Sequence, residues 1–191
     1  MKKLYSTSRL ILKVLEPEES CRVLNFYTEG REVFDAVEEV KPPAFYTGQY
    51  HKTALSYEKY DFENESYMRY YIFCADDSDT IIGTVSFSHI MKGVYNSCII
   101  GYKFLPRFQK QGYATEAVSR LIEAIFTENG IHRIEAFVLP DNYDSIRLLT
   151  RLGFKFEGLA ESVILLRDGY TDHKRYALVS IQTSVPVSKL T

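Results

Sequence analysis

A short basic turn between an apolar strand and an amphipathic helix carries the clearest chemical signal in this sequence. The apolar run that includes Gly101 stops at Pro106, and a helical pattern begins near Gly112. Because the first amides of a helix lack intrahelical partners and the helix dipole is positive at that end, such a turn favours an anion. The alternative is a structural helix start with solvated basic side chains. The polar side chains of the turn are Arg107, Gln109, Lys110 and Gln111.

Other common reaction chemistries find no support in the residue pattern. The sequence lacks the phosphate loop G-x-x-x-x-G-K-[ST], the dinucleotide pattern G-x-G-x-x-G and the hydrolase elbow G-x-S-x-G. The four histidines show no metal-ligand spacing, and the three cysteines are widely separated. We therefore expect no metal site and no disulfide framework.

The elements that must position the turn follow from hydrophobic periodicity and turn residues. Strands are expected over residues 10–15, 70–74, 80–87, 95–105, 132–139, 154–158, 162–166 and 170–179. Helices are expected over 18–28 and 53–60, from 112 to the glycine at 130, and from 140 to 152. The helix after Gly112 has the strongest pattern, because its apolar residues form one continuous stripe. That stripe consists of Ala114, Ala117, Val118, Leu121, Ile122, Ile125 and Phe126.

Strands paired as meanders, with helices interposed only in places, predict an α+β fold: one domain with a mixed, mostly antiparallel central sheet flanked by helices. We expect residues 1–182 to form this domain and 183–191 a loose C-terminal tail. A net charge of −2 gives no reason to expect nucleic acid. The sequence shows no signal peptide and no apolar stretch of the roughly 20 residues that span a bilayer. A cytoplasmic protein without membrane contact, monomeric or homodimeric, is expected.

The basic turn resembles a loop of a known enzyme superfamily. Gln109-x-x-Gly112-x-Ala114, placed between a strand and a helix, is similar to the pyrophosphate-binding loop of the GNAT N-acetyltransferases. The resemblance implies a GNAT-type domain that uses acetyl-CoA as cosubstrate and needs no metal.

A later segment and the start of the chain extend the resemblance to about residues 7–180. Asn142-x-x-Ser145 and the run Gly-Phe-x-x-Glu-Gly from Gly153 resemble a second motif of the superfamily. Both are similar to the RimJ/RimL-like branch, which acetylates ribosomal-protein N-termini, and the start Ser-Arg-Leu-Ile-Leu over 8–12 matches that branch as well. The resemblance therefore implies an acceptor that is a protein N-terminus or another primary amine.

The resemblance assigns binding roles position by position. The backbone amides of the turn would hold the pyrophosphate of coenzyme A, and the strand edge over 102–105 would pair with its pantetheine amides. Asn142 would bond the pantetheine arm, although it is also a good helix N-cap. Ser145 would lie near the thiol, although it could be a simple polar first-turn residue. The implied cofactor-binding residues are Phe104, Leu105, Gln109, Lys110, Gln111, Gly112, Tyr113, Ala114, Thr115, Asn142 and Ser145.

Acetyl transfer needs a neutral amine and a proton for the departing thiolate. An α-amine is roughly one-tenth neutral at pH 7, whereas lysine is neutral in under about one part in a thousand, so an N-terminus needs less help from a base. Relatives usually carry a Glu before Ile-Gly-Tyr, but this chain has Ile99 there. A base, if needed, would be Glu135, Glu161 or a water chain. The proton donor would be Ser145, Tyr143 or a water.

The stretch 45–67 contains seven Tyr and Phe residues between chain breakers, where relatives build their acceptor site. We expect it to form one wall of the amine pocket, against the alternative of ordinary core packing. Acidic residues there could attract a cationic amine, namely Glu58, Asp61, Glu63 and Glu65. Three functions stay open at this point: acetylation of a protein N-terminus, acetylation of a small amine, and acyl-CoA sensing by a catalytically weak relative.

Overall fold

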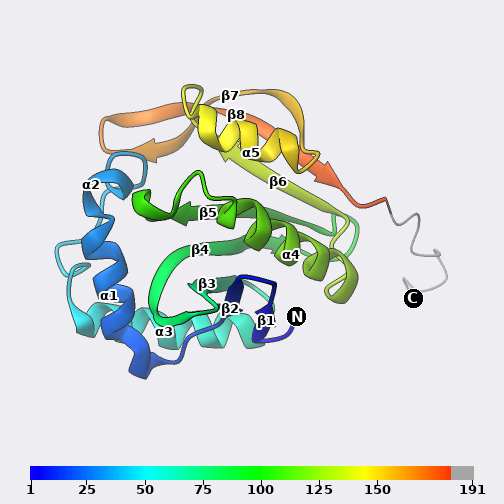
Figure 1. Cartoon of the computed structure of the whole chain (residues 1–191). Coiled ribbons are helices and arrows are strands. Elements are labelled where there is room, and N and C mark those ends of the chain that lie inside the picture. Colours follow the sequence, from blue (N-terminus) through cyan, green and yellow to red (C-terminus); the bar gives the residue numbers. More distant parts are fainter. Residues whose placement is uncertain (182–191) are drawn as a thin grey trace.

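A twisted sheet, split between two of its strands, organises the computed structural model, which describes residues 1–181 (Figure 1). The predicted tail over 183–191 lies outside the described residues. Within residues 1–181 all eight strands belong to one sheet of order β1-β2-β3-β4-β5-β6-β8-β7. Only β5 and β6 pair in parallel, and the other neighbours are antiparallel. The predicted α+β fold with a mixed, mostly antiparallel sheet is confirmed.

The strands and helices have the following bounds. The strands are β1 (Leu4–Ser6), β2 (Leu10–Lys13), β3 (Met68–Cys74), β4 (Asp77–Met91), β5 (Ser97–Phe104), β6 (Arg133–Val138), β7 (Lys155–Leu166) and β8 (Gly169–Val179). The α-helices are α1 (Ser20–Glu29), α2 (Arg31–Phe34), α3 (Gly48–Glu63), α4 (Tyr113–Glu128) and α5 (Tyr143–Arg151). Two short 3-10 helices, Pro17–Glu19 and Pro106–Phe108, precede α1 and follow β5. No α-helix of the described residues has the length and apolarity needed to cross a membrane.

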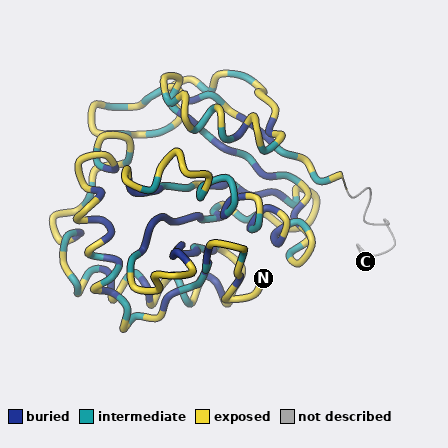
Figure 2. Tube along the Cα trace, in the orientation of Figure 1, coloured by how far each residue is buried: buried dark blue, intermediate teal, exposed yellow. Residues whose placement is uncertain are grey.

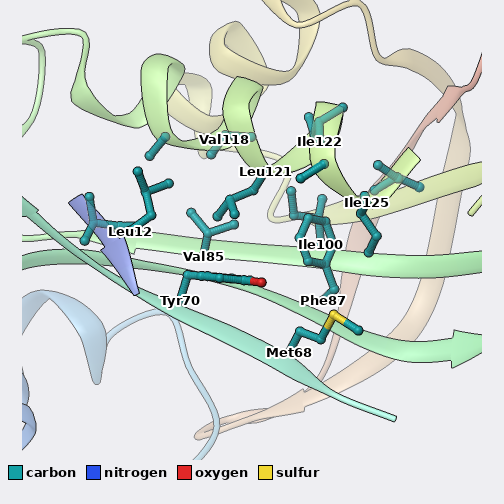
Figure 3. Packing of buried hydrophobic residues seen from close by; sticks show 14 of the residues in the cluster. Leu12, Met68, Tyr70, Val85, Phe87, Ile100, Val118, Leu121, Ile122 and Ile125 are labelled. Atoms are coloured by element: carbon teal, nitrogen blue, oxygen red, sulfur yellow. The ribbon is translucent and has the colours of Figure 1, made fainter. Parts of the chain in front are cut away.

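The α4 helix packs its apolar stripe against one face of the sheet, as its period predicts. Figure 3 shows Val118, Leu121, Ile122 and Ile125 pointing toward side chains of the central strands. Among the latter are Leu12, Tyr70, Val85, Phe87 and Ile100, all buried. Gly130, with φ of +67°, follows the last helical residues at the position where a left-handed glycine ends a helix.

The opposite face of the sheet is covered by α1 and α3. Alternate residues of β3, Tyr71 and Phe73, point to this side and pack with Phe26 of α1 and Leu55 of α3. In Figure 2 the central strands are largely buried, whereas the β7–β8 hairpin is largely exposed or half-buried. The sheet is therefore covered on both faces at its centre, and its β7 edge projects away from the core.

Several elements differ from the sequence-based expectation. The helix expected over 53–60 extends over the whole of α3, because Thr47 caps it by accepting a hydrogen bond from the Tyr50 amide at 3.2 Å. The two strands expected over 154–166 are one strand, β7, whose register shifts twice. Positive φ angles at Gly158 (+141°) and Ser162 (+48°) fall at these irregularities, which explains why the alternation looked interrupted. β1 and α2, at three and four residues, were not predicted.

Candidate functional site

β5 and β6 separate after a short stretch of pairing, which leaves one edge of β5 open. Their parallel register covers only Ser97–Ile99 against Arg133–Glu135, whereas β4 pairs with β5 as far as Phe104. In Figure 1, β6 runs obliquely away from β5. The backbone of residues 101–104 on the β6 side therefore has no neighbouring strand within residues 1–181. An extended ligand could add to this edge as a further strand would.

The basic turn follows directly at the end of this open edge. Gly112 is the N-cap of α4 with φ of +84° and offers no side chain to cap the helix. The first intrahelical bond runs from the Glu116 amide to the Gly112 carbonyl at 3.0 Å, so the amides of residues 113–115 precede it. Lys110 is also left-handed, with φ of +59°, and is exposed. Unpaired amides, the positive end of a 16-residue helix and a cation thus meet at one point.

The two glutamines of the turn brace its backbone. Gln109 Nε2 donates to the Phe104 carbonyl at 2.9 Å, and Gln111 Nε2 donates to the Arg107 carbonyl at 2.7 Å. Arg107 itself forms an ion pair with Glu29 at 2.7 Å. These side chains therefore shape the turn. The amides of residues 113–115, which precede the first helical bond, and the Lys110 side chain are left for an anion.

Phe104 and Leu105, two of the predicted binding residues, have buried side chains. Phe104 packs in the core under α4, and Leu105 packs in the core under α1 and α3. The Leu105 amide donates to the Ile82 carbonyl on the β4 side at 2.9 Å. A ligand at this end of β5 would thus meet backbone atoms and not the side chains.

Asn142 and Ser145 lie across the split from β5. Asn142 Oδ1 accepts a hydrogen bond from the Ser145 amide at 3.1 Å, so Asn142 is the N-cap of α5. The Tyr102 hydroxyl of β5 donates to the Ser145 carbonyl at 3.4 Å, which joins α5 to the open strand. Burial raises the pKa of Tyr102 to about 12, so this hydroxyl stays protonated at neutral pH. Tyr143, the alternative proton donor, is exposed.

The two candidate bases occupy different surroundings. Glu135 of β6 stands beside Ile99 of β5 in the parallel register, and it accepts a hydrogen bond from Arg133 Nε at 2.8 Å. Arg133 also pairs with Glu157. Glu161 is exposed on β7 near its second irregularity. A catalytic role for either residue stays a prediction.

A cavity of about 760 Å³ lies beside β5, on the face of the sheet that α1 and α3 cover. Its walls come from α3, from residues 37–45 before it, from β3–β6 and from the β7–β8 hairpin. Gly101, Tyr102 and Lys103 of β5 contribute to the lining, so the cavity adjoins the open edge. The aromatic stretch 45–67 forms one wall, through Phe45, Tyr50, His51, Tyr57 and Glu58 among others.

Other residues of the stretch 45–67 do not line the cavity. Phe62 packs in the core beside Tyr70, and Tyr60 is exposed. Of the four acidic residues, only Glu58 lines the cavity. Glu63 pairs with Lys3 and Glu65 with Lys92, while Asp61 accepts a hydrogen bond from Ser66.

Beside the expected Glu58, the cavity contains charged residues that sequence reasoning missed, among them Glu38, Lys41, Arg69 and Lys103. Arg69 of β3 donates to Glu58 at 2.7 Å, and the Tyr71 hydroxyl donates to the same carboxylate at 3.0 Å. Glu38 pairs with both Lys41 and Lys103. Burial acts to raise the pKa of Glu38, but the two ammonium groups lower it on balance. The signal in the sequence was a charged residue at or in a strand: Arg69 stands directly before the apolar run expected over 70–74, and Lys103 lies within the strand expected over 95–105.

His51 is the one polar side chain of the described residues with a buried, unpartnered atom. Its Nε2 has no hydrogen-bond partner, and its ring stacks on Tyr27 with the ring centres 5.3 Å apart. Burial, together with the positive charge of Arg69, lowers its pKa to about 4. The imidazole is therefore neutral at physiological pH.

The described residues contain no group of His, Cys, Asp and Glu that could hold a metal ion.

Comparison with known proteins places this geometry in a family. A family model described as an acetyltransferase (GNAT) domain matches residues 9–155. The probable N-acetyltransferase YjcK of Bacillus subtilis (strain 168) is 31% identical over 88% of this chain and 91% of its own length. The ribosomal protein uS5-alanine N-acetyltransferase of Escherichia coli (strain K12) is 28% identical over 92% of this chain and 90% of its own.

A solved structure agrees in fold. Mycobacterium smegmatis RimJ in complex with CoA-disulfide superposes with a TM-score of 0.84 at 20% identity, over 92% of this chain and 85% of that one. At this identity the likeness concerns the fold alone.

Proposed function

This chain belongs to the GNAT acetyltransferase family and is an acetyl-CoA-dependent N-acetyltransferase, and we propose that its acceptor is the α-amine of a protein N-terminus. The observation that carries the proposal is the 760 Å³ cavity beside the open edge of β5. Its volume lies within the range of pockets that bury most of a drug-sized molecule, so it can receive the end of a chain. The similarity to a uS5-alanine N-acetyltransferase supports a ribosomal protein as the acceptor. The oligomeric state, monomer or homodimer, stays a prediction.

The residues of the turn fit the pyrophosphate of coenzyme A. Gly112 lacks a Cβ and is left-handed, so the amides of residues 110–115 can approach an anion closely, and Thr115 can add a hydroxyl. The Gln109 amide instead donates to the Pro106 carbonyl at 3.1 Å. Lys110 adds a positive charge. The edge over 102–104 would hold the pantetheine arm, with the Asn142 amide group and Ser145 on the opposite side. Acetyl-CoA supplies the acetyl group as a reactive thioester.

The protein residues at this site favour an acceptor that needs little deprotonation. Ile99 cannot accept a proton, and His51, with a pKa of about 4, is a weak base. An α-amine with a pKa of about 8 is partly neutral at pH 7 without a strong base, unlike a lysine side chain. The Ser145 hydroxyl is our candidate for the proton donor, because Asn142 and Tyr102 fix its backbone beside the split. It would pass its proton to the departing thiolate and take up the proton that the amine loses as the amide bond forms, so that the hydroxyl is restored. Glu135 is our candidate for a base, since it stands beside Ile99.

A screen for thiol release from acetyl-CoA tests the proposal. The panel contains peptides with a free N-terminal Ala or Ser, the same peptides blocked at the α-amine, and small polyamines. We expect turnover with the free peptides and background rates with the blocked ones. Turnover with polyamines alone would instead establish the small-amine reading. No feature of the described residues supports the sensor alternative, and silence across the whole panel would contradict our proposal.

A further inference from the structure

Glu116, in the first helical turn of α4, links the N-terminal end of this helix to residues 7–9, which precede β2. Glu116 Oε1 accepts hydrogen bonds from the Thr7 hydroxyl at 2.6 Å, from the Ser8 hydroxyl at 3.3 Å and from the Arg9 amide at 3.1 Å. Its Oε2 accepts from Arg9 Nε at 2.7 Å and lies 2.6 Å from Arg9 Nη2. Burial acts to raise the pKa of Glu116, but the bonds from Thr7 and Arg9 lower it on balance, so the carboxylate is charged. Arg9 is thereby fixed by a two-pronged contact.

The same guanidinium reaches three consecutive residues of the turn. Arg9 Nη1 donates to the Gln111 carbonyl at 3.1 Å. Its Nη2 lies 3.3 Å from where a Cβ on Gly112 would stand, and its central carbon lies 4.7 Å from the centre of the Tyr113 ring. None of these contacts would be needed to form α4, whose stripe faces the sheet. They hold the backbone of residues 111–113, where we expect the anion to bind.

Peptide geometry gives the Gln111 contact a consequence. The Gln111 carbonyl and the Gly112 amide belong to one trans peptide unit, so they point in opposite directions. When Arg9 holds the carbonyl on its own side, the Gly112 N–H points to the other side. Glycine at φ of +84° would otherwise allow this unit to rotate easily. Arg9 also offsets the negative charge that Glu116 brings to the helix end, where it would repel an anion.

We propose that Arg9, held by Glu116, is a positioning residue that orients the Gln111–Gly112 peptide and so determines the affinity for the nucleotide end of acetyl-CoA. The proposal rests on the placement of the pyrophosphate at this turn. It requires no contact between Arg9 and the ligand. Its effect is limited to ligands that carry the pyrophosphate.

The test compares acetyl-CoA with S-acetylpantetheine, which carries the same thioester but no pyrophosphate or nucleotide. Arg9→Met keeps most of the stem and removes the guanidinium. We expect KM for acetyl-CoA to rise about tenfold, the equivalent of ~1.4 kcal/mol, with kcat little changed. The kcat/KM for S-acetylpantetheine should not change. Arg9→Lys keeps the charge but loses the planar fork, so we expect an intermediate KM.

Arg120→Met is the matched control. Arg120 lies on α4 and, like Arg9, pairs with a carboxylate (Glu123) and covers a tyrosine ring (Tyr5), but its contacts are away from the turn. It should leave both substrates unaffected. An equal loss with both substrates in Arg9→Met, or an unchanged KM for acetyl-CoA in both Arg9 variants, would overturn the positioning role. If the wild-type protein does not prefer acetyl-CoA over S-acetylpantetheine, the placement of the pyrophosphate itself is wrong.

Discussion

Replacing His51 should alter how the stability of the protein depends on pH. The imidazole is 2% exposed, its Nε2 has no partner, and Arg69 is close enough to disfavour a second positive charge. In the unfolded chain the ring titrates normally, at a pKa of about 6.5. In the folded protein the pKa is about 4. The unfolded state therefore binds more protons between these two values, and stability falls as the pH is lowered from 6.5 to 4.

The size of the effect follows from the two pKa values. A fall from 6.5 to about 4 corresponds to roughly 3 kcal/mol, since each pKa unit is worth about 1.4 kcal/mol. Carboxylates with lowered pKa, such as Glu116 and Glu157, also lose stabilising contacts in acid. Subtracting the profile of a variant without the imidazole cancels their contribution, because they are present in both proteins.

The assay is urea denaturation of wild type and His51→Gln at intervals from pH 4 to 7.5. The difference in the free energy of unfolding should change by roughly 3 kcal/mol across this range, in favour of the variant at low pH. His51→Phe, which keeps a ring for Tyr27 to stack on, should show the same pH dependence whatever its stability at pH 7. His89→Gln, at an exposed position of β4, is the control. Parallel profiles for wild type and both His51 variants would refute the reasoning.

Two further substitutions test the parts of the proposed site. Gly112→Asp puts a side chain on a residue with φ of +84° and adds a negative charge beside the N-terminal end of α4. We expect that coenzyme A no longer raises the melting temperature of this variant, and a shift as large as that of the wild type would contradict the pyrophosphate assignment. Ser145→Ala removes the hydroxyl but keeps the backbone amide that donates to Asn142, so we expect kcat to fall about a hundredfold with KM for acetyl-CoA nearly unchanged. A kcat equal to that of the wild type would exclude Ser145 as the proton donor.

The local elements were predictable because their signals are local. The α4 stripe, the glycine after it, and the capping position of Asn142 follow from spacing alone, and the structure has all three. The turn before α4 was visible for the same reason, since Gly112 and the basic residues are contiguous in sequence, and its binding of an anion stays a prediction. The irregular β7 was read as two strands because Gly158 and Ser162 break its alternation without ending its pairing.

The cavity could not be predicted in the same way, because it depends on pairings between distant segments. Glu38 lies in an irregular stretch and finds Lys103 on β5, and Glu58 on α3 finds Arg69 on β3. The sequence indicated an aromatic wall, and Phe45, Tyr50 and Tyr57 form it. The clamp from Arg9 to Glu116 joins residues that are 107 positions apart, and neither residue has a local pattern that points to the other.

The central claim is that the acetyl group goes to an α-amine beside the open edge of β5. One peptide that carries both a free N-terminal α-amine and an internal lysine tests it directly, after incubation with the protein and acetyl-CoA and location of the acetyl group by fragment mass spectrometry. We predict a single acetyl group on the N-terminal residue, with release of one equivalent of coenzyme A thiol. Acetylation of the lysine with a free N-terminus remaining would contradict the account.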